Sequence, residues 1–291
     1  MDLPALLASS PILFITLAVI LGLLVGSFLN VVIYRLPLMM EREWQTQCAE
    51  LLGNTAPPAH DQPIFNLWTP RSQCPNCGHL IRAHENIPLF SYLLQRGRCA
   101  HCDVAISIQY PLVEAASGIL AGIVAWKFGF GWPAAAALLL TWTLLAASVI
   151  DFHHQLLPDT LTLPLLWAGL GAALLGCFTD LHSAVVGAMV GYLSLWLVYQ
   201  AFRLLTNKEG MGYGDFKLLA ALGAWTGWQY LLTIIILSSL VGAVFGLTLI
   251  LLRGRDRSIP MPFGPFLATA GWITLLWGGA INRAYLHGLG L

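Results

Sequence analysis

The sequence predicts an all-α polytopic membrane protein with about eight transmembrane helices. Two features of the composition predict this class: 57% of the 291 residues are hydrophobic, and only 10% are charged. A soluble globular protein carries about 25% charged residues. A third observation is that the apolar residues form runs of about twenty, the length that crosses the hydrocarbon core of a bilayer. The strict alternation that is typical of a transmembrane β-barrel does not occur.

Eight apolar runs are bounded by charged or turn residues, and each is expected to form one helix. They are Pro11–Tyr34, Leu112–Phe130, Trp132–Ile150, Leu161–Phe178, Ala184–Phe202, Leu218–Trp228, Leu231–Leu252 and Pro262–Ile281. The run from Leu218 has too few residues before Gln229 to cross a bilayer, so it is expected to be a half-span or a re-entrant helix. The first run has neither a basic segment before it nor a small-residue cleavage site, which favours a retained anchor over a signal peptide.

The runs divide the chain into three parts. Residues 1–34 are expected to form an N-terminal transmembrane anchor, residues 35–111 a cytosolic zinc-binding insert, and residues 112–291 a seven-helix membrane core. Within the insert, residues 38–52 have a roughly helical pattern that is compatible with a helix on the membrane face. Residues 53–70 contain four prolines and are expected to be a flexible connector.

The positions of the basic residues predict the orientation of the spans. With the N-terminus outside, twelve of the fourteen Lys and Arg residues fall on one side of the membrane, and only Lys127 and Arg283 fall on the other. Short cytosolic loops are enriched in basic residues, so the insert and the loops at 151–160 and 203–217 are expected to be cytosolic. The net charge is zero, so no overall field attracts nucleic acid.

Four of the six cysteines form two C-x-x-C units that are separated by 21 residues. Two such units predict one tetrahedral metal ion, and the ligands are Cys74, Cys77, Cys99 and Cys102. Zinc is the expected ion. Its role is structural, because four thiolates leave no open coordination position. Iron in place of zinc, and disulfides between the same cysteines, are the alternatives.

The remaining two cysteines and two nearby histidines are not expected to bind the metal. His79 and His101 stand beside the four cysteines and are alternative ligands. Cys48 and Cys177 have no partner at ligand spacing, so they are expected to be small, buried apolar side chains.

Two aspartates stand at the cytosolic ends of spans, where ionisable groups are expensive and seldom idle. Asp151 ends the third run, and Asp215 follows a Gly-Tyr-Gly turn at 212–214 that lets the backbone bend and approach another helix. Together they would form a dyad in which one carboxylate is ionised and the other holds a proton, as aspartic proteolysis requires. From the residues alone, a second interpretation stays open, in which both are helix caps or interfacial charges.

Other polar residues near span ends are expected to be structural. Asp159 is predicted to be the N-cap of the fourth span, and Glu114 a helix N-terminal charge. His153 and His154 are not expected to bind a metal, because adjacent side chains diverge and no third ligand is apparent. No pattern for a serine or cysteine nucleophile, for a zinc protease or for a nucleotide-binding loop is found.

Several short segments occur together and in order over most of residues 26–223. They are GSFLNVVIYRLP at 26–37, CPNC, CAHC, IPLFSYLLQRGRC at 87–99, ISIQYPLVE at 106–114, DFHHQLLPD at 151–159 and MGYGDFKLLAALG at 211–223. This set resembles the bacterial type IV prepilin peptidases, which are membrane aspartic proteases of the GxGD type. By motif position, the resemblance places the two family aspartates at Asp151 and Asp215, with the proline of LLPD at Pro158.

The resemblance implies an aspartic endopeptidase of the bacterial inner membrane, with a periplasmic N-terminus. It would remove the short basic leader of type IV prepilins, or of the pseudopilins of type II secretion, on the cytosolic side and after the glycine that ends the leader. Members commonly also methylate the new N-terminal residue with S-adenosylmethionine. No residues that bind this cofactor are recognisable here.

The sequence departs from the family pattern at one position near Asp151, and one other function was considered. Family members often carry an acidic residue where this chain has His153, so this position is not expected to be essential. The alternative is a proton-coupled transporter with a regulatory zinc knuckle. It predicts charges near the bilayer midplane and two similar halves, and the sequence shows neither. The sequence does not predict the oligomeric state.

Overall fold

A computed structural model of the chain describes residues 3–53, 65–208, 210–253 and 261–288. This described part is helical and has no β-strand; two isolated β-bridges lie in the cysteine-bearing insert. The chain forms two compact units, one of Ile12–Ile123 and one of Met1–Pro11 with Val124–Leu291. The prediction of an all-α membrane protein is confirmed.

The first unit contains two long helices, α2 (Pro11–Leu51) and α4 (Gln109–Phe128), with the insert between them in the sequence. α2 has 41 residues and is about 60 Å long, about twice the thickness of the hydrocarbon core. The segment predicted to be helical at 38–52 therefore continues the first span, and Pro37 lies inside the helix. Most of the connector predicted at 53–70 lies outside the described residues.

Small residues let α2 and α4 approach closely. A Cβ atom added to Gly22 would lie 2.7 Å from the Cβ atom of Ala121, and one added to Gly26 would lie 2.8 Å from the Cα atom of Glu114. The hydroxyl group of Ser117 donates a hydrogen bond to the carbonyl oxygen of Gly22. Close backbone approach at small residues is the usual way in which helices associate in a membrane.

The insert of this unit is short of regular structure. Its helical parts are a 3₁₀ turn (Ala83–Asn86) and α3 (Phe90–Leu94). Arg35, near the middle of α2, is buried and donates hydrogen bonds to the carbonyl oxygens of Asn66 and Pro70 at 2.8 and 2.6 Å. These bonds hold residues 66–70 of the insert against α2.

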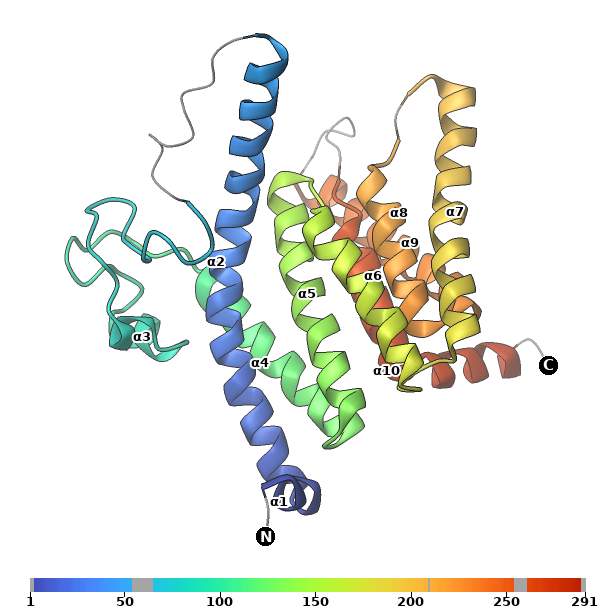
Figure 1. The fold of residues 1–291 in the computed structure, drawn as a ribbon, viewed down its shortest axis with the longest axis horizontal. Helices are drawn as coiled ribbons and strands as arrows, with labels where there is room; N and C mark the ends of the chain where they lie inside the picture. The colour runs from blue at the N-terminus through green and yellow to red at the C-terminus, as the bar shows by residue number, and fades with distance from the viewer. Residues whose placement is uncertain (1–2, 54–64, 209, 254–260, 289–291) are drawn as a thin grey trace. The chain divides into compact units, whose positions relative to one another are not determined.

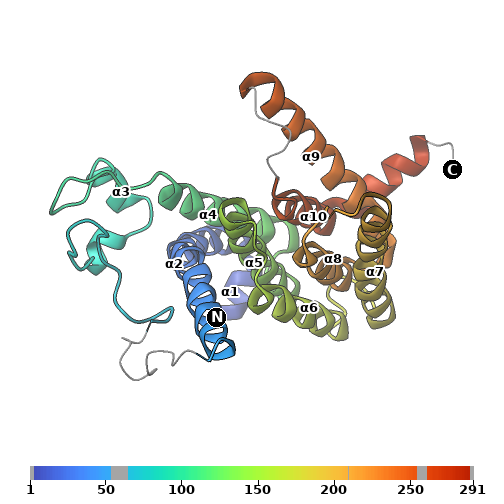
Figure 2. The ribbon, with the colours of Figure 1, turned by 90° about the horizontal axis from the view of Figure 1, so that it is seen from above.

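The second unit is a helical bundle (Figures 1 and 2). Its helices are α1 (Leu3–Ser9), α5 (Trp132–His154), α6 (Asp159–Leu174), α7 (Leu181–Thr206), α8 (Tyr213–Thr226), α9 (Leu231–Arg253) and α10 (Gly264–Gly288). The short helix α8 packs against α6, α7 and α10. Nearly all of its residues from Asp215 to Thr226 are buried, so α8 is the centre of the bundle.

Close contacts hold α8 in this central position. A Cβ atom added to Gly187 of α7 would overlap the carbonyl oxygen of Gly223, so the two backbones are in contact. The indole of Trp225 is buried and donates a hydrogen bond of 2.8 Å to the carbonyl oxygen of Leu165 in α6. A buried indole N–H group needs such a partner.

Each of the eight predicted apolar runs contains a helix in the described part of the chain, but α4 ends at Phe128 and α6 at Leu174, before the predicted ends of their runs. Six of the helices are long and apolar enough to cross a membrane: α2, α4, α5, α7, the helix from Trp228 to Thr248 and the helix from Gly264 to Ala284. α6 has 16 residues and α8 has 14. α8 is thus about 21 Å long and shorter than the hydrocarbon core, as predicted for a half-span.

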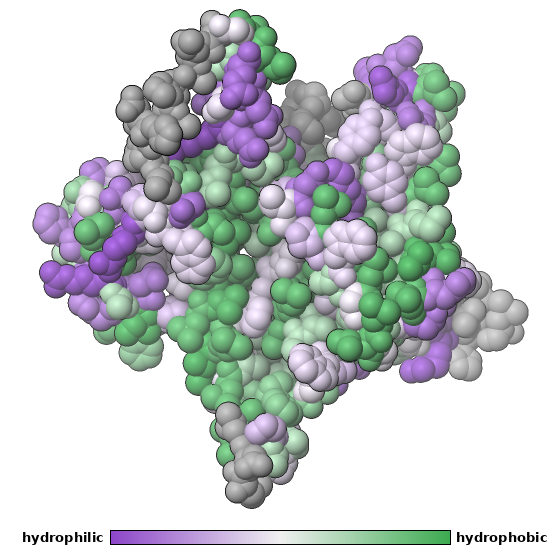
Figure 3. Space-filling view, in the orientation of Figure 1, coloured by the Kyte–Doolittle hydropathy of each residue, from purple (hydrophilic) through white to green (hydrophobic). Residues whose placement is uncertain are grey.

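The surface agrees with a multi-pass membrane protein. Large apolar side chains are exposed along the long helices, among them Trp126 of α4 and Leu247 of α9, which are 66% and 58% exposed. The space-filling view shows apolar side chains over the long helices and polar side chains gathered over the insert (Figure 3). Such extensive apolar surface indicates lipid contact.

Candidate aspartate site and cysteine metal site

Asp151 lies in the last turn of α5. The helix ends at His154, and Gln155 follows with a left-handed backbone (φ +53°), its N–H group donating to the carbonyl oxygen of Asp151. The Asp151 side chain points into the bundle and is only 6% exposed. Its Oδ2 atom accepts a hydrogen bond of 3.0 Å from the backbone N–H group of Gly264, the first residue of α10.

Asp215 lies in the first turn of α8 and is also buried, with 8% of its surface exposed. Its carboxylate interacts electrostatically with that of Asp151 and with the backbone of Gly212. Its Oδ1 atom is buried and has no hydrogen-bond partner among the described residues. The two aspartates that the sequence singled out are therefore neighbours, although 63 residues lie between them in the chain.

Leu157, in the link between α5 and α6, packs against Gly214, just before Asp215, and against Gly264, the first residue of α10. A Cβ atom added to Gly214 would lie 2.6 Å from the Cβ atom of Leu157, and one added to Gly264 would lie 3.2 Å from its Cδ1 atom. The glycine before Asp215 thus allows a close approach, but to the link between α5 and α6 and not to another helix as the sequence predicted.

Gly264 and Leu157 were not predicted from the sequence as residues of this site. The available signal for Gly264 is the pattern Met261-Pro-Phe-Gly-Pro265, in which a glycine between two prolines opens the last apolar run. Leu157 gave no comparable signal, because a leucine before a helix is unremarkable in an apolar sequence.

The four predicted metal ligands form one cluster. The sulfur atoms of Cys74, Cys77, Cys99 and Cys102 all lie within 4.8 Å of one another, and no other such group is found among the described residues. The Cys74 and Cys102 sulfurs are 3.8 Å apart, much farther than the length of about 2.05 Å of a disulfide bond. All six cysteines are free, so the disulfide alternative is wrong.

Two similar turns present these sulfurs. In the first, the N–H group of Gly78 donates to the carbonyl oxygen of Cys74; in the second, the N–H group of Asp103 donates to that of Cys99. Both Gly78 and Asp103 have a left-handed backbone, with φ values of +70° and +55°. Each turn brings two sulfurs of a C-x-x-C unit to one point, which fits a tetrahedral ion.

The two nearby histidines and the two remaining cysteines are not part of this cluster. His79 and His101 stack on one another with ring centroids 5.3 Å apart and do not belong to the cluster. His79 instead pairs with Glu85 at 3.2 Å. Cys177 is partly buried, but Cys48 is exposed, so its predicted burial is wrong. Cys48 lies on the part of α2 that extends past Pro37, where no residue is buried.

Comparison with known proteins identifies the family. The model of the bacterial peptidase A24 N-terminal domain matches residues 20–128, and the model of the type IV leader peptidase family matches residues 138–247. A prepilin leader peptidase/N-methyltransferase of Stutzerimonas stutzeri is 59% identical, over 97% of this chain and 96% of the relative. The chain belongs to the type IV leader peptidase family.

Further relatives carry the same name. The prepilin leader peptidase/N-methyltransferase of Pseudomonas aeruginosa is 58% identical, over 97% of this chain and 96% of its own length. That of Xanthomonas campestris pv. campestris is 49% identical, over 93% and 94%. No solved structure matches the chain significantly. The two family models divide the candidate sites: the first contains the four cysteines, and the second contains both aspartates but ends before Gly264.

Two structural predictions about acidic residues in this leader peptidase are wrong. Asp159 does not cap α6, because Pro158 is the N-cap; its carboxylate pairs instead with the Lys217 ammonium group at 2.6 Å. Glu114 is not in the first turn of α4 but is buried, 8% exposed, and accepts a hydrogen bond of 2.8 Å from the N–H group of Leu89. Both partners are distant in the sequence.

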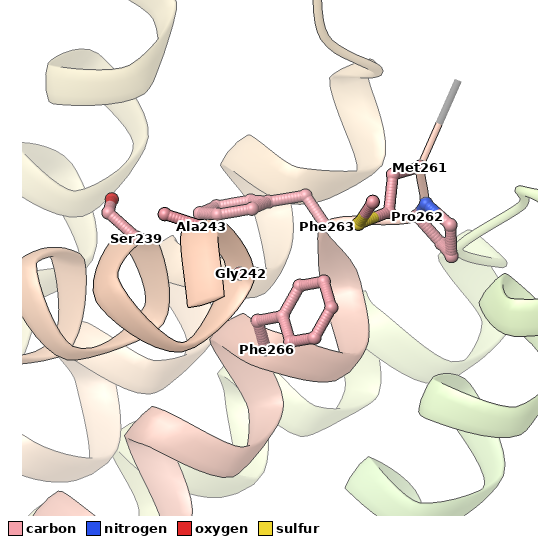
Figure 4. A pocket seen from close by; sticks show the side chains of 7 residues that line it. All are labelled: Ser239, Gly242, Ala243, Met261, Pro262, Phe263 and Phe266. Carbon is pink, nitrogen blue, oxygen red and sulfur yellow. The ribbon is translucent and has the colours of Figure 1, made fainter. Parts of the chain in front are cut away.

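An apolar cavity of about 290 Å³ adjoins the first turn of α10 (Figure 4). It is lined by Ser239, Gly242 and Ala243 of α9 and by Met261, Pro262, Phe263 and Phe266. The start of α10 thus contributes Gly264 to the surroundings of Asp151, and Phe266 together with the preceding Phe263 to this cavity.

Proposed function

We propose that this leader peptidase removes the leader of type IV prepilins, or of type II secretion pseudopilins, with Asp151 and Asp215 as its catalytic dyad. The observation that carries the proposal is the pair of buried carboxylates, which interact electrostatically from the ends of two helices. If the two aspartates were helix caps or interfacial charges, there would be no reason for them to be buried next to one another. Two buried carboxylates that repel one another favour a state in which one is protonated and the other is ionised, and this is the arrangement that activates water for peptide hydrolysis.

Each of the two carboxyl groups has one task in the reaction, which depends on whether it is ionised or protonated. The ionised carboxylate takes a proton from a water molecule, whose oxygen forms a bond to the scissile carbonyl carbon. The protonated carboxyl group donates its proton to the carbonyl oxygen as that bond forms. When the C–N bond breaks, the leaving nitrogen takes a proton from the carboxyl group that received it from water. The other carboxylate takes back a proton from a hydroxyl group of the tetrahedral intermediate as the C=O bond re-forms, so the dyad returns to its initial state.

The orientation of this reaction follows from the positions of the basic residues. We place the protein in the bacterial inner membrane, with a periplasmic N-terminus and the dyad at the cytosolic face. In this arrangement residues 1–34 are the anchor, residues 35–111 the zinc-binding insert and residues 112–291 the membrane core. A leader that has not crossed the membrane is then on the side of the dyad.

We further propose that the cysteine cluster holds one structural zinc ion. Zinc–sulfur bonds of about 2.3 Å in a tetrahedron place the sulfurs about 3.8 Å apart. The distance between the Cys74 and Cys102 sulfurs is 3.8 Å, which supports this assignment. The amide group of Asn76 lies 3.6 Å from the Cys102 sulfur and stabilises its negative charge.

The names of the relatives also support a second reaction, methylation of the new N-terminal residue. S-adenosylmethionine would supply the methyl group. The amine that accepts it exists only after the leader has been removed, so cleavage comes first. The residues that bind this cofactor are not assigned.

One experiment tests both activities. Purified protein in detergent is incubated with a prepilin peptide and methyl-labelled S-adenosylmethionine, and the masses of the products are measured. We expect loss of the leader and the gain of one methyl group. An unchanged peptide mass would contradict the proposed function. The transporter alternative is not favoured, because the buried acidic pair lies at helix ends instead of at the middle of spans.

A further inference from the structure

We propose that Gly264 is a positioning residue for the dyad: its N–H group and its lack of a side chain together fix the Asp151 carboxylate. The inference rests on the proposed function of Asp151. It adds a third segment, the start of α10, to the two segments that carry the aspartates.

The N–H group of Gly264 is free to bind a carboxylate because of its place in α10. The carbonyl oxygen of Phe263 accepts hydrogen bonds from the N–H groups of Phe266 and Leu267, so Phe263 is the N-cap and Gly264 the first helical residue. The N–H groups of a first turn have no acceptor within their helix. Pro265, the next residue, has no N–H group. Gly264 therefore offers the first free donor of α10, and it donates to Asp151 Oδ2 at 3.0 Å.

The N–H group of Gly264 stabilises the Asp151 carboxylate at a position that is otherwise unfavourable for a negative charge. Asp151 is in the last turn of α5, where the carbonyl ends of the helix disfavour a negative charge. The N-terminus of α10 has the opposite polarity and favours a carboxylate. The contact with Gly264 therefore offsets the unfavourable position of Asp151 in its own helix, and it fixes the direction of the carboxylate by a directional bond.

The missing side chain of Gly264 is equally required. A Cβ atom at this position would lie 2.6 Å from Asp151 Oδ2 and 3.2 Å from its Cγ atom. Leu157 Cδ1, also at 3.2 Å, closes the adjacent space. The carboxylate would have to turn away from the N–H group to make room. Any side chain at position 264 therefore displaces the carboxylate that the backbone otherwise holds.

Gly264→Ala is the first test, with Gly279→Ala as its matched control in the same helix. A Cβ atom at Gly279 would meet no atom closer than 3.7 Å. For Gly264→Ala we expect kcat for leader removal to fall by roughly 10²-fold, the typical cost of a displacement of about 1 Å, with KM nearly unchanged. Methylation of a peptide without leader reports on folding and should be unchanged. Gly279→Ala should cleave like the wild-type enzyme.

A second variant separates the hydrogen bond from the steric effect and remains decisive if Gly264→Ala does not fold. Gly264→glycolic acid, introduced by nonsense suppression, replaces the N–H group by an ester oxygen and adds no atoms. No helical hydrogen bond is lost, so the fold should persist, and we expect kcat to fall while KM is retained. Wild-type kcat in the ester variant, or a rise in KM without loss of kcat in either variant, would overturn the inference.

The Asp151→Asn variant, assayed in parallel, keeps the two proposals apart. If it is inactive while both Gly264 variants cleave normally, the dyad stands and the role of Gly264 is refuted. If Asp151→Asn itself cleaves normally, the proposed function of Asp151 fails, and the inference about Gly264 fails with it.

Discussion

The Oδ2 atom of Asp151 accepts a hydrogen bond from the backbone N–H group of Gly264, which lies 113 residues further along the chain. This contact joins the last turn of α5 to the first turn of α10. Asp215 lies at the start of α8. The preceding residue, Gly214, packs against Leu157, and Leu157 also packs against Gly264. Three helix ends thus surround the two carboxylates, and the predictions below test this arrangement and the parts of the chain that support it.

Removal of one cysteine ligand should release the metal. For Cys74→Ser we expect loss of zinc and local unfolding of the insert, because the folding of so small a segment depends on the metal. Cys48→Ser, which changes an exposed cysteine outside the cluster, is the control and should keep the full metal content. Metal analysis of freshly purified proteins measures both. A wild-type protein without zinc or iron would contradict the assignment.

The buried Glu114 should stabilise the unit that contains the insert. Glu114→Ala leaves the N–H group of Leu89 without its acceptor, and an unsatisfied buried group costs about 1–3 kcal/mol. The melting temperature in detergent should therefore fall. Glu50→Ala, at an exposed position near the end of α2, should leave it unchanged. Equal melting temperatures for the two variants would mean that the Glu114 contact has no net effect on stability.

Asp180 should make the stability of α7 depend on pH. It is the N-cap of α7, and the N–H group of Ser183, which donates to its side chain at 2.9 Å, holds the pKa of this carboxyl group below its usual range. A lowered pKa means that the stabilisation is present above the ordinary value of about 3.9 and is lost as the pH falls through the lower, folded-state value.

The comparison of wild type with Asp180→Ala over pH measures this effect. The difference in melting temperature should be largest near neutral pH and should shrink in acid. Asp180→Asn keeps a capping oxygen but does not titrate, so it should differ from Asp180→Ala by the same amount at every pH. A wild-type advantage that grows in acid would contradict the sign of the prediction.

Labelling from outside intact cells tests the orientation. Arg71 and Arg283 are both exposed, so a cysteine at either position is accessible from its own side. We expect a membrane-impermeant thiol reagent to label Arg283→Cys and to miss Arg71→Cys. The opposite result would invert the topology and would move the dyad to the wrong face for a leader that has not crossed.

The general fold was predictable because its signals are local. Apolar runs of spanning length give the helices, and the early Gln229 correctly predicts that α8 is short. The two C-x-x-C units predict the cluster, since the spacing within each unit fixes the turn that presents its sulfurs. The pairing of Asp151 with Asp215 followed from their similar places at helix ends and from the motifs around them.

Contacts between a side chain and a partner distant in the sequence were not predictable. Asp159 stands at a helix start, as a cap would, but Lys217 attracts its carboxylate. Glu114 stands near a helix start, but Leu89 supplies a donor from within the insert. Gly264 was missed for the same reason, because its role depends on α5 and not on its neighbours in the chain.

The central claim is that Asp151 and Asp215 together carry out the cleavage, and asparagine variants test it most directly. Asparagine keeps the shape of aspartate but can neither accept a proton from water nor return one, and positioned proton transfer is typically worth about 10²–10⁴ in rate. Asp159→Asn is the matched control, because its exposed ion pair with Lys217 contributes little.

Leader removal from a prepilin peptide, followed by product mass, is the decisive measurement. We expect Asp151→Asn and Asp215→Asn each to abolish it while each variant stays folded, keeps its metal and methylates a peptide without leader. Asp159→Asn should cleave nearly as fast as the wild-type enzyme. Near-normal leader removal by either dyad variant, or a loss in Asp159→Asn as complete as theirs, would contradict the account.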